Sequence, residues 1–436
     1  MKYLEGFFYV MKYKEFLEHI YKRHSGNVKL GLSRMHNILK KMDNPNKKLS
    51  GIHIAGTNGK GSTAAICEAL ALEHGFSTGM NTSPHLVDYK ERFRLNGNNI
   101  DFENLLRIYH EWENIFHNEQ ASFFEITTAI AFYYFWEQQV DMAIFEVGLG
   151  GRLDGTKPFS STVSIITTIA YDHLKSLGNT LSKIAYEKAG IIKNNQQVIL
   201  GKIKNQPKET IKKIASARNA QAYEFGKDFT IKNIKINKDG TYFDYLSSDF
   251  ALDNIRINLL GKYQAINASL ALTAFHMFLL SKGLKLNLDK IKLAMQKVNW
   301  PGRLQIIRRQ PIVIIDGAHN EEGIDALIKN INKLYPKERI FFLLAILKDK
   351  NLDKIIRNIC ILSRKIFISK NNSSRAADIS LQEKFVKKYT LNYEIIPNIA
   401  KAYNSALAEI NKNDVLIVSG SLYTISEVLK YEQQGN

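Results

Sequence analysis

The chain is poor in cysteine and has no long hydrophobic run. Its 436 residues include two cysteines, Cys67 and Cys360, which are too few for a disulfide framework and too far apart for a cysteine metal motif. We expect both to be buried thiols in a reducing compartment. No apolar run approaches the roughly 18 residues of a transmembrane helix. The region from Met1 to Tyr21 lacks the apolar core and cleavage site of a signal peptide. These absences predict a cytoplasmic protein.

Acidic side chains are in the minority. The sequence has 60 Lys and Arg residues against 42 Asp and Glu residues, a formal net charge of +18 at pH 7. Such an excess is compatible with nucleic acid, a membrane surface or an acidic small substrate. The basic residues are nearly all lysine and are scattered, and clusters such as Lys40-Lys41 are typical of solvated faces. We therefore expect an anionic small-molecule substrate, and neither nucleic acid nor a membrane as a partner.

The stretch from His53 to Thr63 carries the clearest signal for chemistry. An apolar run ends at Ala55, a glycine-rich turn with one lysine follows, and Ala64–Leu72 has the pattern of an apolar helix. A helix start of this kind presents unpaired N–H groups and a positive dipole end to phosphate. We expect a nucleotide-binding P-loop, although Ile54 stands where the first glycine is usual, and an ordinary strand-to-helix turn is the alternative. The residues assigned to ATP binding here are Gly56, Thr57, Asn58, Gly59, Lys60, Gly61, Ser62 and Thr63.

The length excludes a single hydrophobic core and predicts two domains. The segment Asn299–Arg303 contains adjacent proline and glycine, and the order of the predicted elements changes after it. We therefore place the first domain at residues 1–297 and the second at residues 298–436. An apolar content of 45% with 23% charged residues is typical of soluble globular domains.

Both domains are predicted to be α/β. In the first, the short apolar strands Met142–Val147 and Val163–Ile169 are separated by helical segments, the order of a parallel sheet. From Phe229 the hydrophobic period changes to two, and Lys238-Asp239-Gly240 predicts a small β-hairpin. Strands and helices alternate again from Ile312 to Val418. The expected fold is a P-loop NTPase-like parallel-sheet domain with a hairpin region, followed by a doubly wound, Rossmann-like domain.

Polar residues follow several of the predicted strands. Glu146 lies at the end of one strand, and Asp172 and His173 follow another. Carboxyl ends of parallel strands meet at one edge, where α/β proteins bind ligands. A carboxylate and an imidazole near a phosphate loop suit a metal–ATP site, because Mg²⁺ prefers oxygen ligands. A salt bridge for Glu146 and an ordinary polar role for His173 are the alternatives. The segment Asp316–Asn320 follows the first strand of the second domain, which suggests a site between the domains.

Six segments in the same order resemble the folylpolyglutamate synthase/dihydrofolate synthase family, within the Mur ligase group of ATP-dependent amide-forming ligases. The resemblance runs from Gly31–Arg34 to Ser419–Tyr423 and so covers nearly the whole chain. Gly155, Lys157 and Glu321 depart from the family pattern. Of these, Lys157 is the one expected to change contacts near the loop after Glu146. The six segments are Gly56–Thr63, Ser83–Leu86, Glu146–Thr156, Asp172–His173, Glu187–Gly190 and Asp316–Asn320.

The resemblance implies roles for particular residues. Lys188 matches a lysine that the family carbamylates, which would make an anionic group able to support a metal. The implied catalytic residues are Lys60, Lys188 and His319. The implied further ATP contacts are Asn267, Arg303 and Asp316. The implied Mg²⁺ ligands are Ser83, Glu146, His173 and Lys188 as its carbamate. The implied folate-binding residues are Gly31, Arg34, Phe123 and Phe124.

The implied activity is ATP-dependent addition of L-glutamate to the γ-carboxylate of a reduced folate through an acyl phosphate. Addition of glutamate to dihydropteroate is a second implied activity, ATP and Mg²⁺ are the implied co-substrate and metal, and we expect a monomer. A Mur-type ligase acting on another carboxylate and a P-loop ATPase that binds nucleic acid are the alternatives. The stretch before Gly56 is too short for the uridine-nucleotide domain of peptidoglycan ligases. The basic residues form no arginine-rich face with aromatics of the kind that single-stranded nucleic acid requires.

Overall fold

A mostly parallel sheet of eight strands forms the centre of the first domain. The computed structural model describes residues 11–23 and 31–434, and in it the strand order is β4-β3-β2-β5-β1-β6-β7-β8. Strands β2, β5, β1, β6, β7 and β8 run parallel, and β3 and β4 extend one edge of the sheet antiparallel. The strands are β1 (Gly51–Ala55), β2 (Thr78–Asn81), β3 (Arg94–Leu95), β4 (Asn98–Asn99), β5 (Met142–Glu146), β6 (Val163–Ile166), β7 (Gln197–Leu200) and β8 (Gln221–Glu224).

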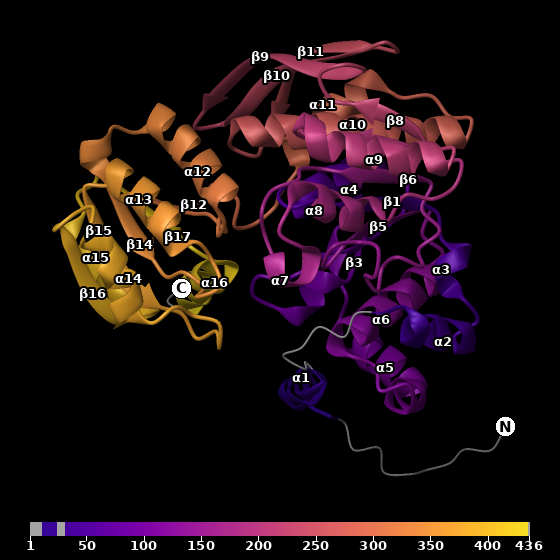
Figure 1. Cartoon of the computed structure of the whole chain (residues 1–436), viewed down its shortest axis with the longest axis horizontal. Coiled ribbons are helices and arrows are strands. Elements are labelled where there is room, and N and C mark those ends of the chain that lie inside the picture. Colours follow the sequence, from indigo (N-terminus) through magenta and orange to yellow (C-terminus); the bar gives the residue numbers. More distant parts are fainter. Residues whose placement is uncertain (1–10, 24–30, 435–436) are drawn as a thin grey trace.

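Helices cover both faces of this sheet (Figure 1). Every residue of β1 and β5 is buried, as expected for central strands with helices above and below. One face packs against α4, α10 and α11, and the opposite face packs against α1, α2, α5 and α6. The helices are α1 (Tyr13–Lys22), α2 (Ser33–Lys41), α3 (Pro45–Lys48), α4 (Lys60–Glu73), α5 (Phe102–Asn118), α6 (Phe123–Glu137), α7 (Leu174–Leu177), α8 (Leu181–Ala189), α9 (Asn205–Ala217), α10 (Lys262–Ser281) and α11 (Leu288–Lys297), with a 3₁₀ helix at Tyr89–Arg92.

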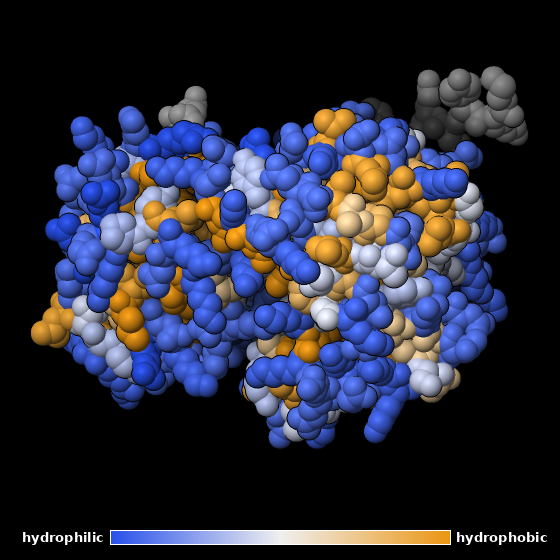
Figure 2. All heavy atoms as spheres, turned by 90° about the horizontal axis from the view of Figure 1, so that it is seen from above, coloured by the Kyte–Doolittle hydropathy of each residue, from blue (hydrophilic) through white to orange (hydrophobic). Residues whose placement is uncertain are grey.

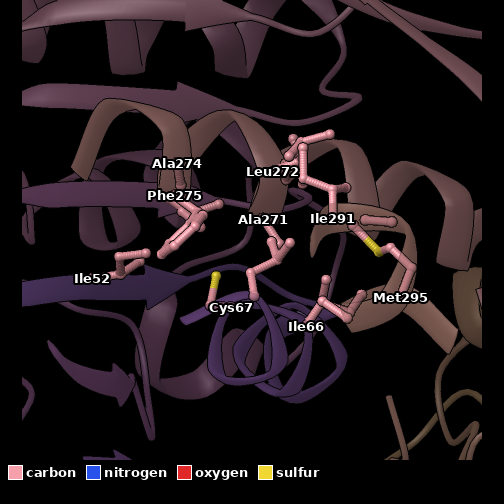
Figure 3. Close-up of a cluster of buried hydrophobic side chains, with 14 of the residues drawn as sticks. Ile52, Ile66, Cys67, Ala271, Leu272, Ala274, Phe275, Ile291 and Met295 are labelled. Carbon is pink, nitrogen blue, oxygen red and sulfur yellow. The ribbon is translucent and has the colours of Figure 1, made fainter. Parts of the chain in front are cut away.

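The core between α4 and α10 is made of small, aliphatic and aromatic side chains. Figure 3 shows Cys67 of α4 facing Ala271 and Phe275 of α10, with Met295 of α11 on the far side of the cluster, near Ile66. Within the described part of the chain, α10 is the one helix long and apolar enough to cross a membrane by length and composition, and 78% of its apolar window is buried inside the molecule. The apolar character of α10 is therefore that of a central core helix.

A small antiparallel sheet lies beyond α10, along the upper edge of the first domain in Figure 1. Its order is β11-β10-β9, and the predicted hairpin is confirmed as β9 and β10. The third strand, β11, pairs with β10 and was not predicted. The strands are β9 (Phe229–Asn237), β10 (Gly240–Ser247) and β11 (Ala251–Ile257).

The second domain is a six-stranded sheet with helices on both faces. Its order is β12-β13-β17-β14-β15-β16, parallel except for β12. Helices α12 and α13 pack on one face, and α15 and α16 on the other. The elements are β12 (Gln305–Arg309), β13 (Ile312–Ile315), α12 (Glu321–Leu334), β14 (Ile340–Leu344), α13 (Leu352–Leu362), β15 (Lys365–Lys370), α14 (Ile379–Val386), β16 (Tyr393–Asn398), α15 (Ile399–Glu409), β17 (Val415–Ser419) and α16 (Leu422–Gln434), with a 3₁₀ helix at Lys337–Arg339.

The predicted fold class is confirmed in both domains. A parallel-sheet domain with an added antiparallel sheet is followed by a doubly wound α/β domain, and the two lie side by side (Figure 1). Helix α11 ends at Lys297 and β12 begins at Gln305, so a boundary at 297/298 stays a prediction within this connection. On the face drawn in Figure 2, hydrophilic residues cover most of the surface and hydrophobic residues emerge in separate patches.

Candidate active site

A cavity of about 320 Å³ lies where the two domains meet, at the carboxyl ends of the strands of both sheets. Its walls come from the loop after β1, the ends of β5 and β6, helix α8, the start of α10 and the segment after β13. The cavity therefore gathers residues that are far apart in the sequence. Those predicted from the sequence that line it are Gly56, Thr57, Asn58, Gly59, Lys60, Gly61, Ser62, Ser83, Glu146, His173, Lys188, Asn267, Arg303, Asp316 and His319.

The loop between β1 and α4 has a backbone that requires glycine. Gly56 and Gly59 have φ values of +152° and +88°, and a Cβ atom at Gly59 would lie 2.5 Å from Asn267 Oδ1. The N–H of Thr57 donates to Thr168 O at 2.9 Å, which ties the loop to the segment after β6. No side chain caps the start of α4. Its first turn, Lys60 to Ser62, lines the cavity without a side-chain cap, the arrangement that phosphate binding requires.

Lys60 and Glu146 face each other at the base of the cavity. Lys60 Nζ lies 3.8 Å from Glu146 Oε1, and the N–H of Ser83 donates to Glu146 Oε2 at 3.2 Å. Burial raises the pKa of Glu146, while the charge of Lys60 and the Ser83 hydrogen bond lower it. A metal ion beside this carboxylate would favour its ionised form.

The donor set here fits a Mg²⁺ ion only in part. Glu146 supplies a buried oxygen donor next to a phosphate loop, which is the arrangement in which Mg²⁺ is bound with substrate phosphates. Among residues 11–23 and 31–434, no cluster of three or more His, Cys, Asp or Glu side chains could hold a metal. A magnesium ion would therefore need further oxygen atoms from Ser83, a modified Lys188, the nucleotide or water.

Lys188 is a buried lysine in the wall of the cavity. Its side chain projects from α8, and Nζ donates to Gly56 O at 2.8 Å. Burial and the nearby charge of Lys60 lower the pKa of Lys188 to about 7. A substantial fraction of this amine is uncharged at neutral pH, which is the form that reacts with carbon dioxide.

Asp172 joins two histidines at the junction of the domains. Asp172 Oδ2 lies 3.8 Å from His173 Nε2 and 3.7 Å from His319 Nε2. Burial raises the pKa of Asp172, but the contact with His319 and the charge of His173 outweigh it, so the pKa of Asp172 lies below its usual range. Burial lowers the pKa of His173 to about 4, against the charge of Asp172. The His173 imidazole is therefore neutral at pH 7, as metal ligation requires.

The second domain places Asp316 and Arg303 on the other side of the cavity. Asp316 is buried and accepts hydrogen bonds from the N–H groups of Leu304 and Ala318 at 2.9 and 2.8 Å. Burial raises the pKa of Asp316, and Arg303 opposes this shift. Tyr263, at the start of α10, donates to Asp316 Oδ2 at 3.4 Å. Asp316 thus connects the segment between the domains, through Leu304, to the start of α10 in the first domain, through Tyr263.

The two domains match two known domain families in turn. Residues 54–275 match the Mur ligase middle domain, and residues 302–422 match the glutamate ligase domain of Mur ligases. A dihydrofolate synthase/folylpolyglutamate synthase of Bacillus subtilis is 31% identical over 96% of this chain and 98% of its own length. The chain belongs to this Mur ligase family.

Solved structures of folylpolyglutamate synthases have the same fold. A Mycobacterium tuberculosis folylpolyglutamate synthase complexed with ADP superposes with a TM-score of 0.89 at 28% identity, covering 95% of this chain and 97% of the other. The E. coli FolC protein in complex with DHPP and ADP gives a TM-score of 0.87 at 26% identity, with 97% of each chain covered. The dihydrofolate synthetase of Saccharomyces cerevisiae is 28% identical over 92% of this chain and 98% of its own length.

Five of the residues that the family resemblance singled out do not line the cavity. Thr63 is buried, and its hydroxyl donates to Gly59 O at 2.8 Å. Arg34 pairs with Glu125 at 3.1 Å, and a Cβ atom at Gly31 would have no neighbour within 4 Å. The Phe123 ring packs against Tyr21 and Tyr89, whereas Phe124 packs against Gly148 and Gly155 of the loop after β5. Folate binding by Gly31, Arg34, Phe123 and Phe124 stays a prediction.

Some residues that line the cavity were not predicted from the sequence. Tyr263 and Lys202 stand in segments with no phosphate-binding or metal-binding pattern. Glu322 lies two residues beyond the segment Asp316–Asn320, and its carboxylate accepts from Asn58 Nδ2 at 2.7 Å. Its place directly after a predicted motif is the signal that could have identified it.

Proposed function

We propose that this member of the family is an ATP-dependent ligase that adds L-glutamate to the γ-carboxylate of a reduced folate. The observation that carries the proposal is the single cavity in which Lys60, Glu146 and Lys188 of the first domain face Arg303 and His319 of the second. A reaction that uses three substrates needs such a site between two domains, because closure excludes the water that would hydrolyse an activated carboxyl group. The nucleotide occupies the first domain, and the two acids meet it at the junction.

The proposed reaction proceeds by acyl activation. The γ-phosphoryl group of ATP passes to an oxygen of the folate γ-carboxylate, which gives an acyl phosphate and ADP. The amine of glutamate then attacks the acyl carbon, loses a proton and displaces inorganic phosphate. Lys60 and the N–H groups at the start of α4 offset the charge on the phosphoryl group. His319, at the edge of the second domain, lines the cavity and is proposed to contact the incoming amino acid or the phosphate.

The metal assignment belongs to the same proposal. Ser83, Glu146, His173 and Lys188 as its carbamate would hold Mg²⁺, and the ion would supply Lewis-acid stabilisation of the phosphate charge. The lowered pKa of Lys188 supports its carbamylation, and the neutral imidazole of His173 supports its role as a ligand.

Further parts of the proposal rest on the family resemblance. The name of the Bacillus subtilis relative joins two activities, so dihydropteroate is proposed as a second glutamate acceptor. Asn267, Arg303 and Asp316 are proposed to bind ATP, and Phe123 and Phe124 to contact the pterin ring. A monomeric state, a cytoplasmic location and the lack of nucleic-acid or membrane partners stay predictions.

The test is a ligation assay with ATP, Mg²⁺ and glutamate, using tetrahydrofolate and dihydropteroate in separate reactions. Glutamylated product by mass spectrometry is the expected result, and ATP turnover stimulated by DNA or RNA instead would favour the nucleic-acid ATPase. Lys60→Ala should lose about 10²-fold or more in ligation rate, the scale of removing one preorganised charge. Lys47→Ala removes an exposed lysine and serves as the matched control, with unchanged activity. Near-normal activity of Lys60→Ala would overturn the role of the P-loop.

A further inference from the structure

A buried ion pair crosses from one domain to the other beside the cavity. Lys350 lies between β14 and α13 of the second domain, and its Nζ is 2.6 Å from Asp172 Oδ1 of the first domain. The Lys350 side chain is 5% exposed and that of Asp172 is 10% exposed. The two residues are 178 positions apart. No sequence motif connects them, and the pair exists only where the two domains meet.

The pair fixes the orientation of the Asp172 carboxylate. Oδ1 accepts from Lys350 Nζ and from the N–H of His173 at 2.9 Å. Oδ2 is therefore left facing the imidazoles of His173 and His319, at 3.8 and 3.7 Å. His319 is held on its other side, because Nδ1 lies 2.8 Å from Gly317 O. The Asp172 carboxylate thus lies between a histidine of the first domain and a histidine of the second.

Other charges around Lys350 do not compete for this role. Asp349 Oδ2 lies 3.6 Å from Lys350 Nζ but is paired at 2.7 Å with Arg375. The Asp349 and Arg375 side chains are each more than 40% exposed, so solvent weakens their interaction with Lys350. The short contact of Lys350 is with Asp172, inside the junction.

We propose that Lys350 is a positioning residue that clamps the two domains through Asp172 and so sets the places of His173 and His319 when the cleft closes. The clamp rests on the proposed function, since it is the ligation reaction that requires both histidines at one centre. Opening the cleft would return both charges to water, whereas removing one partner leaves the other charge buried and unpaired in the closed arrangement, which is far more disruptive than removing both. The pair therefore specifies the register in which the two domains close, since only that register pairs both buried charges.

The test compares Lys350→Met, Asp172→Asn and the double variant with the parent chain. Small-angle scattering with a non-hydrolysable ATP analogue reports closure, and parallel assays give ligation and ATP hydrolysis. Lys350→Met should remain more open than the parent and lose about 10-fold to 10²-fold in kcat for ligation, the scale of misplacing reacting groups. KM for ATP should change little, because the P-loop is untouched. Lys348→Met, two residues away and exposed, is the matched control and should behave as the parent does.

The double variant separates a clamp from independent structural effects. Its loss should be no greater than that of either single variant, because the interaction is already absent in each. Lys350→Arg, which keeps the charge, should recover closure and coupling in part. Scattering profiles of Lys350→Met that match the parent, or losses that add in the double variant, would overturn the clamp. If the parent transfers no glutamate to folate, the proposed function fails, while the scattering comparison still decides whether the clamp exists.

Discussion

At the scale of single residues, the charge state of Lys188 is set by its surroundings. Its pKa of about 7 makes roughly half of the amine neutral at pH 7 and about a tenth of it neutral at pH 6. We expect protein free of metal and nucleotide, incubated with ¹³C-bicarbonate, to give a carbamate carbon signal at pH 8 that is much weaker at pH 6. Lys188→Met should give no such signal. Equal signals at both pH values would contradict the assignment.

The lowered pKa of Lys188 also makes the free energy of unfolding depend on pH. An unfolded lysine holds its proton up to about pH 10.4, whereas folded Lys188 loses it near pH 7. Between these values the unfolded chain binds more protons, so the free energy of unfolding contributed by this residue rises with pH. Chemical denaturation from pH 7 to pH 9 should therefore favour the parent increasingly over Lys188→Met. The sign holds for the unmodified amine, so carbon dioxide must be excluded.

Glu146 offers a second test at this scale, through the metal. Glu146→Gln keeps the size of the side chain but removes the charge that faces Lys60. If Glu146 holds Mg²⁺, the variant should need a higher Mg²⁺ concentration for half-maximal ligation. His173→Ala should shift the titration in the same direction. Mg²⁺ titrations that overlay the parent curve would remove the altered residue from the metal site.

At the scale of secondary-structure elements, α4 and the joint between the domains are in direct contact. Gly61 lies in the first turn of α4, and a Cβ atom there would lie 2.8 Å from Trp300 Cζ2. Alanine in a helix is favoured over glycine by about 1 kcal/mol at most, but the partly buried indole would have to move. We expect Gly61→Ala to lower the free energy of unfolding and to weaken ATP binding, measured by denaturation and calorimetry.

The indole contact can be isolated with a second variant. In a Trp300→Ala background the added methyl group has room, so Gly61→Ala should there be neutral or stabilising. A gain in stability from Gly61→Ala alone would mean that helix propensity outweighs the contact with Trp300.

The elements were predictable where their signals are local. The apolar runs of β1 and β5, the glycines before α4 and the hairpin turn at Lys238-Asp239-Gly240 are adjacent in sequence, and each depends on backbone geometry that neighbouring residues decide. Strand β11 escaped prediction because its residues alternate only partly between buried and exposed. The residues predicted to be catalytic or ATP-binding, other than Thr63, line one cavity, since strand ends of a parallel sheet share one edge.

What local patterns could not give is the pairing of distant residues. Lys350 has no motif that links it to Asp172, and Tyr263 meets Asp316 only because the start of α10 reaches the second domain. The separation of Phe123 and Phe124 into different environments depends on how α6 rotates against α1 and the loop after β5. These are tertiary facts, which follow from packing rather than from the sequence pattern.

At the scale of the whole molecule, the cavity is complete only when the domains are together. Arg303 lies at the joint and opposes the raised pKa of both Asp316 and Glu146, which belong to different domains. We expect Arg303→Ala to slow formation of the acyl phosphate and to raise ATP hydrolysis that is not coupled to ligation. The ratio of phosphate released to glutamate incorporated measures this coupling.

Closure itself should be visible without a variant. Scattering profiles of the parent with a non-hydrolysable ATP analogue and folate should show smaller overall dimensions than those of the free protein, because ligands that contact both domains favour the closed state. Identical profiles, together with unchanged coupling in Arg303→Ala, would count against closure of the two domains around the nucleotide.

The position of Trp300 also provides an optical signal. The chain has three tryptophans, and Trp112 and Trp136 pack on α5 and α6, on the face of the sheet opposite α4. Only Trp300 touches the first turn of α4 at the domain joint. Indole fluorescence depends on local polarity and quenching, so with Trp112→Phe and Trp136→Phe the emission would come from this one ring. The protein would then report nucleotide arrival through its own fluorescence, in stopped-flow time and without an attached dye.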